Sequence, residues 1–308
     1  MSVFEETCKA ITPKNIAIGD AVKRTWDGVA MYGNYGKLVD MTAQYAMATN
    51  QSLEDNTLHI PKRCMIIASA DHGVAEMGVS AYPQDVTVGM TQNYLIPKGA
   101  GANALANYCE ADMEVIDVGI AADMSWVPGL RHEKIAYGTK NFLKAPAMTK
   151  TQAIKAIEAG IELVNEKVKE GYNVFLVGEM GIANTTSSAV MTAKFAGITA
   201  DEATGRGTNI SDERLKVKQK VVHDALIKYA HIDKNDGLGI LQSVGGFEFA
   251  CITGVILGAA AQHAMVVIDG FNTTVCALVA HAIVPESMDY VMASHLSAEK
   301  AHVRALKV

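Results

Sequence analysis

The stretch NVFLVGEMGIANTTSS (residues 173–188) joins an apolar run to a segment of glycines and small polar side chains. The run Val174 to Val177 is short and bounded by turn-forming residues, which is typical of a strand buried on both faces of a parallel sheet. One acid, Glu179, stands where this strand is expected to end. Ligands of parallel α/β sheets bind beyond the carboxyl ends of the strands, so the position predicts a functional carboxylate.

Three further segments repeat this plan of a short apolar run followed by an acid. They are residues 64–70 before Asp71, 113–116 before Asp117 and 265–268 before Asp269. Helical patterns separate them, and the clearest begins at Thr149 with a capping-box arrangement to Gln152 and stops at Gly171. This alternation predicts a three-layer, doubly wound, mainly parallel α/β sheet.

A boundary near residue 60 is expected from the helix-like character of the first part of the chain. We predict a small helical subdomain over residues 1–60, with the C-terminal end as a candidate to complete it, and an α/β domain over residues 61–308. The four acids are predicted to line the ligand crevice of the α/β domain. The alternative is that they cap the helices that follow, because Asp is a favoured N-cap residue.

Composition and charge exclude several classes of protein. A net charge of -6 without a basic stripe argues against a nucleic-acid partner. Five scattered cysteines without a Cys-x-x-Cys pair fit reduced thiols in a cytoplasm better than disulfides or a zinc site. No secretory signal is visible, and the longest apolar run, residues 249–261, reads as a buried helix instead of a membrane span.

Two polar segments are typical of an anion site. Asn184, Thr185 and Thr186 offer side-chain hydrogen bonds at an expected helix start, and residues 204–209 (TGRGTN) place two glycines where backbone could approach a phosphate. Neither segment is a Walker A loop, and this absence favours a ligand with a single phosphate over a nucleoside triphosphate. The alternative interpretation is an ordinary polar turn. Residues 98–104 (KGAGANA) imitate a dinucleotide fingerprint, but no strand is expected before them.

Histidines could serve as metal ligands or general bases. His72, His295 and His302 have no spacing typical of a metal site, so we expect neither a metal nor a cofactor. His72 is better interpreted with Asp71 as an orienting pair at a loop.

Taken together, eight segments resemble the nicotinate-nucleotide:dimethylbenzimidazole phosphoribosyltransferase family, which activates the lower-ligand base of cobamides. The segments occur in family order and are DHGVAEMGVSAYPQDVT (71–87), VIDVGI (115–120), GTKNFLKAPAMT (138–149), GEMGIANTTSS (178–188), TGRGT (204–208), VGGFE (244–248), IDGF (268–271) and SHLSAE (294–299). The resemblance implies transfer of the 5-phosphoribosyl group from nicotinate mononucleotide to a base, giving an α-ribotide and nicotinate.

The resemblance also implies roles for individual residues. Glu179 corresponds to a catalytic position, and the expected base pocket contains Ser80, Tyr82, Gly89 and Met90. The expected nucleotide and phosphate site consists of Gly181, Asn184, Thr185, Gly205, Gly207 and Lys218. A solvated helix face is the alternative for Lys218, which lies among other lysines, and ordinary core is the alternative for Met90.

Two departures from the family pattern bear on function. Gly89 stands where the family commonly has Gln, so we hypothesise an altered base preference, with purines or phenols as acceptors. Family members also continue into a Gly-Glu-Gly motif whose glutamate is regarded as the principal base, whereas these 308 residues end at Val308. Four explanations stay open: a truncated chain, a base supplied by a partner subunit, Glu179 acting alone, or a catalytically incomplete subunit that supports an active partner.

The family resemblance implies oligomers as well. We expect a homodimer, or a heterodimer with a related chain.

Overall fold

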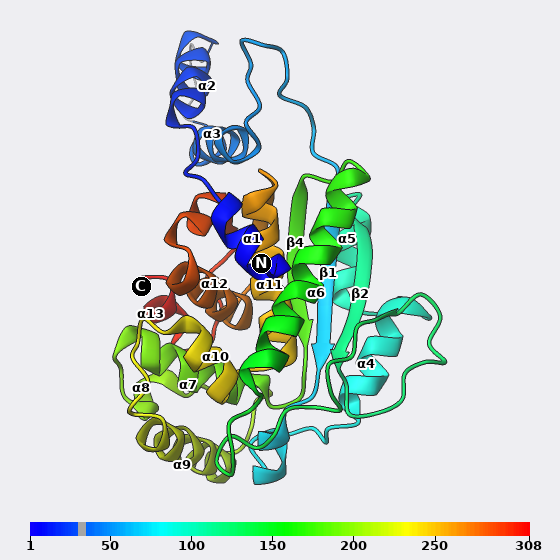
Figure 1. The fold of residues 1–308 in the computed structure, drawn as a ribbon, viewed down its shortest axis with the longest axis vertical. Coiled ribbons are helices and arrows are strands. Elements are labelled where there is room, and N and C mark those ends of the chain that lie inside the picture. Colours follow the sequence, from blue (N-terminus) through cyan, green and yellow to red (C-terminus); the bar gives the residue numbers. More distant parts are fainter. Residues whose placement is uncertain (30–34) are drawn as a thin grey trace.

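A six-stranded sheet forms the centre of the computed structural model, which describes residues 1–29 and 35–308 (Figure 1). The strands lie in the order β3-β2-β1-β4-β5-β6, and each neighbouring pair is parallel. Their bounds are β1 (Arg63–Ala70), β2 (Asp112–Gly119), β3 (Arg131–His132), β4 (Val174–Met180), β5 (Met265–Ile268) and β6 (Val291–Ala293). The predicted doubly wound parallel sheet is confirmed.

All four apolar runs form strands, but two strands continue past their predicted ends. Asp117 pairs with Ser69 and Glu179 pairs with Ala68, so both acids lie inside β2 and β4. The ladder continues because β1, between these two strands, offers backbone partners as far as Ala70.

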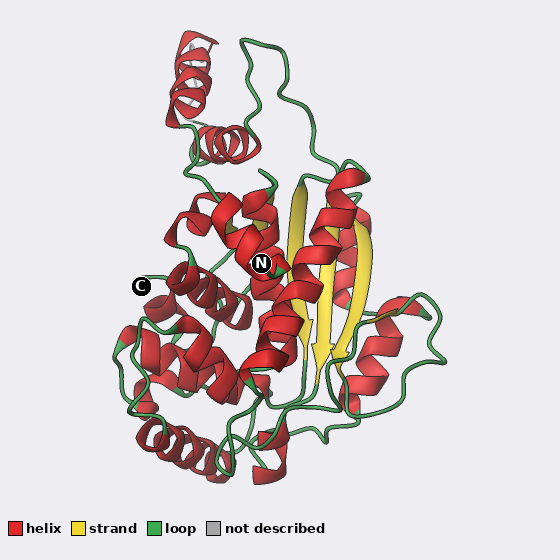
Figure 2. Cartoon of the chain, in the orientation of Figure 1, coloured by secondary structure: helices red, strands yellow, loops and turns green. Residues whose placement is uncertain are grey.

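Helices cover both faces of the sheet (Figure 2). They are α1 (Val3–Ala10), α2 (Ile16–Val29), α3 (Leu38–Thr49), α4 (Val86–Leu95), α5 (Gly101–Tyr108), α6 (Lys150–Lys169), α7 (Asn184–Ala196), α8 (Ala200–Ala203), α9 (Asp212–Lys228), α10 (Gly237–Val244), α11 (Phe247–Ala261), α12 (Phe271–Ile283) and α13 (His302–Ala305), with 3-10 turns η1 (Gly73–Met77) and η2 (Pro285–Tyr290). Successive side chains of β1 point to opposite faces of the sheet and pack against different helix layers. Ile66 joins the core with α6 and α11, whereas Ile67 joins the cluster that includes Tyr94 of α4.

The two helices of the main core agree with their sequence patterns. Thr149 and Gln152 form the predicted capping box of α6, with hydrogen bonds of 3.2 and 2.9 Å. Helix α11 is buried from Phe247 to Ala260, as the long apolar run predicts. The helices cross closely enough that a Cβ at Gly254 would collide with the carbonyl oxygen of Ile157, so only glycine fits there.

The N-terminal helices divide between two places. Helix α1 packs against α6 and α11, whereas α2 and α3 pack mainly on each other around Val22, Ala43 and Ala46 and project from the sheet (Figure 1). At the other end of the chain, α13 packs against α7 and α12. Within the described ranges, no helix has the length and apolarity that a membrane crossing requires.

Candidate functional site

The strand order places one crevice at the centre of the sheet. All strands are parallel, but the direction in which successive strands are added to the sheet reverses between β1 and β4. From β1 the chain adds β2 and β3 on one side, and from β4 it adds β5 and β6 on the other. Doubly wound sheets bind ligands beyond the carboxyl ends of the strands at such a switch point. His72 follows β1 and Glu179 lies near the end of β4, so both flank this position.

Two of the four strand-terminal acids do not face a ligand. Asp71 accepts a hydrogen bond from the backbone of Ala121 at 2.8 Å. Asp117 accepts from the amides of Gly119 and Ile120 and forms a 2.7 Å ion pair with Lys134. The prediction that all four acids line the crevice is therefore wrong for these two, which hold the loops after β1 and β2.

The capping interpretation of the acids is also wrong. The N-cap positions of η1, α7 and α12 are occupied by His72, Ala183 and Gly270. Asp269 instead lies exposed after β5. Glu179, near the end of β4, is the fourth of these acids.

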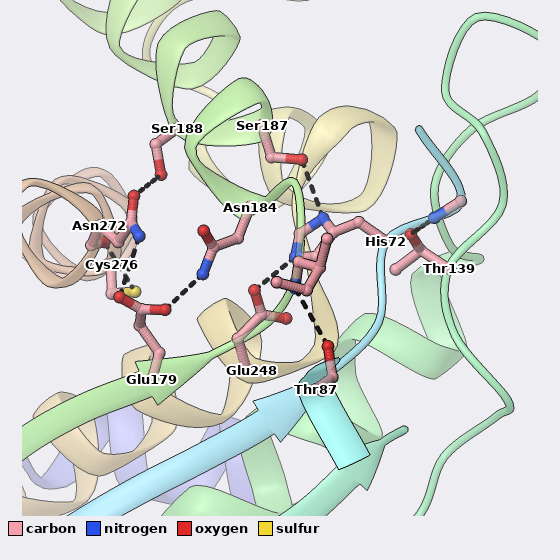
Figure 3. Close-up of polar contacts among 12 residues, drawn as sticks. His72, Thr87, Thr139, Glu179, Asn184, Ser187, Ser188, Glu248, Asn272 and Cys276 are labelled. Carbon is pink, nitrogen blue, oxygen red and sulfur yellow. Dashed lines mark hydrogen bonds and ion pairs between the residues drawn. The ribbon is translucent and has the colours of Figure 1, made fainter. Parts of the chain in front are cut away.

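Glu179 is held by two side-chain amides (Figure 3). Asn184 donates to its Oε2, and Asn272 donates to its Oε1 at 2.9 Å. Ser188 donates to the Asn272 oxygen at 2.7 Å, which turns the Asn272 NH₂ group towards the carboxylate. Burial raises the pKa of Glu179 to about 7, and the carboxylates of Glu248 and Asp269 add to this shift.

Asn272 was missed in the sequence. It directly follows the IDGF segment, so the segment marked its neighbourhood without identifying the amide.

Lys218 reaches the start of α7 from α9. Its side chain is 1% exposed, and its Nζ donates to the Thr185 hydroxyl at 2.8 Å. Burial lowers the pKa of Lys218 to about 8, and the Glu299 carboxylate opposes this shift. The structure thus brings Lys218 and Thr185 together, and the solvated-face alternative for Lys218 is wrong because the side chain is buried.

The loop from Gly205 to Gly207 lies over this pair. A Cβ at Gly207 would approach the Lys218 Nζ to 3.0 Å and the Thr185 hydroxyl to 2.6 Å. The Gly207 amide already donates to Glu299 Oε1 at 2.9 Å, and a Cβ at Gly205 would collide with the same carboxylate. The sequence predicts that the backbone of these glycines approaches a phosphate, but in the structure the Gly207 amide is already occupied by Glu299.

Glu299 belongs to the SHLSAE segment, but nothing in its spacing from the glycines signalled this contact. A cavity of about 430 Å³ is lined by Gly205, Gly207 and Glu299.

The predicted base-pocket residues separate into two groups. Ser80 lies beside the glycine loop, with its hydroxyl 3.4 Å from that of Thr208, and Tyr82 is 55% exposed. Gly89 and Met90 lie on α4, where Met90 packs against an apolar cluster, as its core alternative proposed. A Cβ at Gly89 would meet no atom within 4 Å.

Helix α4 is connected to the Glu179 segment. Thr87 accepts a hydrogen bond from the backbone of Ile182 at 3.2 Å, just after β4. One group therefore contacts the glycine loop, and the other lies on α4, the helix that contacts the turn after β4.

A buried histidine pair was not anticipated. His72 Nε2 lies 2.5 Å from Glu248 Oε1, and His72 Nδ1 lies 3.1 Å from the Ser187 hydroxyl (Figure 3). Burial alone would lower the pKa of His72, but the Glu248 carboxylate outweighs it and the pKa is raised. In the sequence, His72 is interpreted with its neighbour Asp71. Its actual partner, Glu248, lies 176 residues away, and no local pattern connects the two.

The other two candidate histidines, His295 and His302, do not contact Glu179. His302 accepts from the Ser297 amide at 2.8 Å and lies 2.8 Å from the Thr274 hydroxyl, while His295 is exposed. Among residues 1–29 and 35–308, no three His, Cys, Asp or Glu side chains form a group that could hold a metal.

A cavity of about 630 Å³ lies elsewhere, around Lys98, Asn103 and Asp112. It is near the start of β2, at the opposite end of the sheet from Glu179. The KGAGANA segment (98–104) follows α4 and runs into the first residues of α5, so no strand precedes it, as expected.

Comparisons with known proteins agree on one family. A family model described as Phosphoribosyltransferase matches residues 11–308. The nicotinate-nucleotide–dimethylbenzimidazole phosphoribosyltransferases of Chloroflexus aggregans and Geobacter metallireducens are 39% and 40% identical over 303 residues, which is 98% of this chain and 84% of theirs. The crystal structure of CobT from Thermus thermophilus superposes with a TM-score of 0.83 at 32% identity, covering 94% of this chain and 86% of that one.

Proposed function

This chain belongs to the nicotinate-nucleotide–dimethylbenzimidazole phosphoribosyltransferase family, and from that premise we propose that it transfers the 5-phosphoribosyl group of nicotinate mononucleotide to a lower-ligand base in cobamide biosynthesis. The observation that carries the proposal for the site is Glu179. It is a largely buried carboxylate with a pKa of about 7, at the switch point of the sheet.

The reaction needs a proton acceptor and negative charge more than it needs an acid. The bond between C1′ of the ribose and the nicotinate nitrogen breaks with its electron pair going to nicotinate, a pyridinium leaving group that needs no proton. A ring nitrogen of the incoming base, or the hydroxyl oxygen of a phenol, forms the new bond to C1′, and the acceptor loses a proton. Glu179 can accept that proton at neutral pH, and its negative charge stabilises the developing oxocarbenium ion.

The phosphate of the substrate is proposed to bind between α7 and the glycine loop. Lys218 supplies an ammonium, Thr185 a hydroxyl, and the first turn of α7 a partial positive charge. Attack from the face opposite the leaving group requires the two bases to occupy separate pockets. Ser80 and Tyr82 are proposed on one side of that space.

Helix α4 is proposed to determine the acceptor. Gly89 leaves open space where a glutamine side chain would offer an amide. This supports a base other than dimethylbenzimidazole, with phenols and purines as candidates.

Assembly and location are proposals too. An oligomer, as homodimer or as heterodimer with a related chain, is supported by apolar side chains exposed on α3, where Leu38 and Met41 are 50% and 48% exposed. A cytoplasmic location is supported by the five free thiols.

Turnover by the chain tests the proposed function. The protein is incubated with nicotinate mononucleotide and a panel of benzimidazoles, purines and phenols, and nicotinate release and product mass are followed. We expect an α-ribotide, and we expect Glu179→Gln to lower kcat by roughly 100-fold or more because the proton acceptor is lost. Glu162→Gln, an exposed position on α6, serves as the matched control.

Three results would count against the proposal or part of it. Absence of nicotinate mononucleotide binding would overturn it, and binding without turnover would restrict this chain to a nucleotide-binding role. If the Glu179→Gln variant kept the wild-type kcat, Glu179 would not be the proton acceptor.

A further inference from the structure

The His72–Glu248 pair lies at the junction of the segments that form the site. His72 follows β1, Glu248 lies in the first turn of α11, and Ser187 lies on α7. His72 and Glu248 have no exposed surface, and Ser187 is equally buried. Such groups are retained inside a protein only when they are paired and hydrogen-bonded.

Glycines of two other motifs close around the pair. A Cβ at Gly246 would lie 2.5 Å from His72 Cε1 and would collide with Glu248 Oε2. A Cβ at Gly181 would lie 3.3 Å from His72 Cδ2 and 3.4 Å from Glu248 Oε1. The pair therefore supports the turn that follows Glu179 by two residues.

Helix α7 is fixed by the same histidine. Ser187 contacts His72 Nδ1 at 3.1 Å, and one turn earlier on the helix Asn184 donates to Glu179 (Figure 3). Any shift of the imidazole would thus reach Glu179 by two routes, through the Gly181 turn and through Asn184.

In the described part of the chain, Glu248 has one side-chain partner, His72. Its Oε1 contacts the imidazole, while its buried Oε2 has no hydrogen-bond partner among the described residues. A buried carboxylate with one compensating group stays ionised only while that group donates a proton or carries a positive charge.

We propose that the buried His72–Glu248 pair is a positioning element of the active site, which holds Glu179 in place and sets the charge that Glu179 meets. This inference rests on the proposed function. It assigns a role in the reaction to two residues that have no exposed surface.

The charged neighbours of Glu179 determine the sign of the effect. Glu248 on α11 and Asp269 after β5 raise the pKa of Glu179, and His72, when protonated, opposes them. Tyr94 on α4 also interacts with Glu179. In Glu248→Gln the positive charge on His72 is reduced together with the negative charge of Glu248. Because Glu248 is the larger of the two influences on Glu179, the pKa of Glu179 should still fall, which moves the rise of activity with pH to lower pH.

Glu248→Gln tests the proposal, because it keeps the shape and the acceptor oxygen but removes the charge. We expect binding of nicotinate mononucleotide within about threefold of wild type, kcat lowered about tenfold or more, and the rising limb of the pH profile shifted to lower pH. Thr192→Val is the matched control, since this buried hydroxyl on α7 has no hydrogen-bond partner in the described structure.

A second variant keeps the test decisive if Glu248→Gln does not fold. Ser187→Ala removes the other contact of the imidazole, and we expect a threefold to tenfold loss in kcat with unchanged binding. Side-chain ¹⁵N NMR supplies a readout besides activity: the pKa of His72 should be lower in Glu248→Gln than in the wild type, because the carboxylate that raises it is gone.

The failures of the two proposals are distinguishable. An active wild type with unchanged kcat and pH profile in Glu248→Gln, or with unchanged kcat in Ser187→Ala, would overturn the positioning role alone. Loss of stability with wild-type kcat would assign the pair to folding only. A wild type that neither binds nor turns over nicotinate mononucleotide would overturn the proposed function itself.

Discussion

Lys218 is an ammonium group with one hydroxyl partner in an almost fully buried position. Its pKa is lowered from 10.5 to about 8 because burial penalises the charged form. A lysine with a lowered pKa costs folding free energy at pH values below its folded pKa, and the cost disappears as pH rises above the unfolded value. At pH 7 the ammonium therefore destabilises the fold, and a bound phosphate would offset that cost.

Lys218→Met should separate binding from stability. We expect the affinity for nicotinate mononucleotide to fall roughly 10- to 100-fold at pH 7, while the free energy of unfolding rises by about 1–3 kcal/mol. Calorimetric titration and urea unfolding measure the two effects, with the exposed Lys216→Met on the same helix as control. Wild-type affinity should also weaken as pH rises through about 8, and an affinity independent of both changes would contradict the phosphate contact.

At the scale of single elements, the glycine loop is held by a carboxylate in the segment before α13. Glu299 accepts from the Gly207 amide while its charge lies near Lys218. Glu299→Gln keeps an acceptor oxygen and removes the repulsion of an incoming phosphate. At pH 6.5, where Lys218 is protonated, we expect nicotinate mononucleotide to bind about threefold to tenfold more tightly. Equal or weaker binding, with Glu162→Gln as reference, would show that the Glu299 charge does not oppose the phosphate.

Helix α4 carries the position that distinguishes this chain from the family pattern. Gly89→Gln has room for its side chain and replaces a poor helix former, so the free energy of unfolding should rise by about 0.5–1 kcal/mol. We expect kcat/KM for dimethylbenzimidazole to rise relative to purines and phenols. Gly28→Gln on α2, which is equally open, controls for the helix effect. Unchanged acceptor preference in Gly89→Gln would contradict a role for this position.

At the scale of the whole molecule, α2 and α3 project from the sheet around a small core of their own. Leu38 and Met41 are three residues apart on α3 and therefore share an exposed face. If this face joins subunits, Leu38→Lys with Met41→Lys should convert an oligomer into monomers without loss of stability, as measured by sedimentation equilibrium. The exposed Leu105→Lys with Tyr108→Lys on α5 is the control, and an oligomer that survives the α3 changes would place the interface elsewhere.

Much of the fold could be predicted because it depends on local patterns. The four apolar runs became β1, β2, β4 and β5, and the capping box of α6 formed as expected. The edge strands β3 and β6 have two and three residues, which is too short for a periodic pattern to be recognised.

The site residues that the sequence predicted are those that a local motif or the family resemblance marked individually. Glu179, Asn184 and Thr185 are neighbours in the sequence, whereas Asn272, Glu248 and Glu299 join them from distant segments. Asp71 and Asp117 resemble Glu179 in sequence, yet backbone amides occupy their carboxylates.

By itself, the sequence determined the parallel sheet, its buried helices and the position of Glu179 at a strand end, because hydrophobic periodicity and turn chemistry act over a few residues. Only the tertiary structure decided which acid is available for chemistry, which lysine is buried and which histidine carries a carboxylate partner. Those properties depend on burial and on charges brought together from remote segments, and burial and charge are what shift the pKa of Glu179 and Lys218 towards neutral pH.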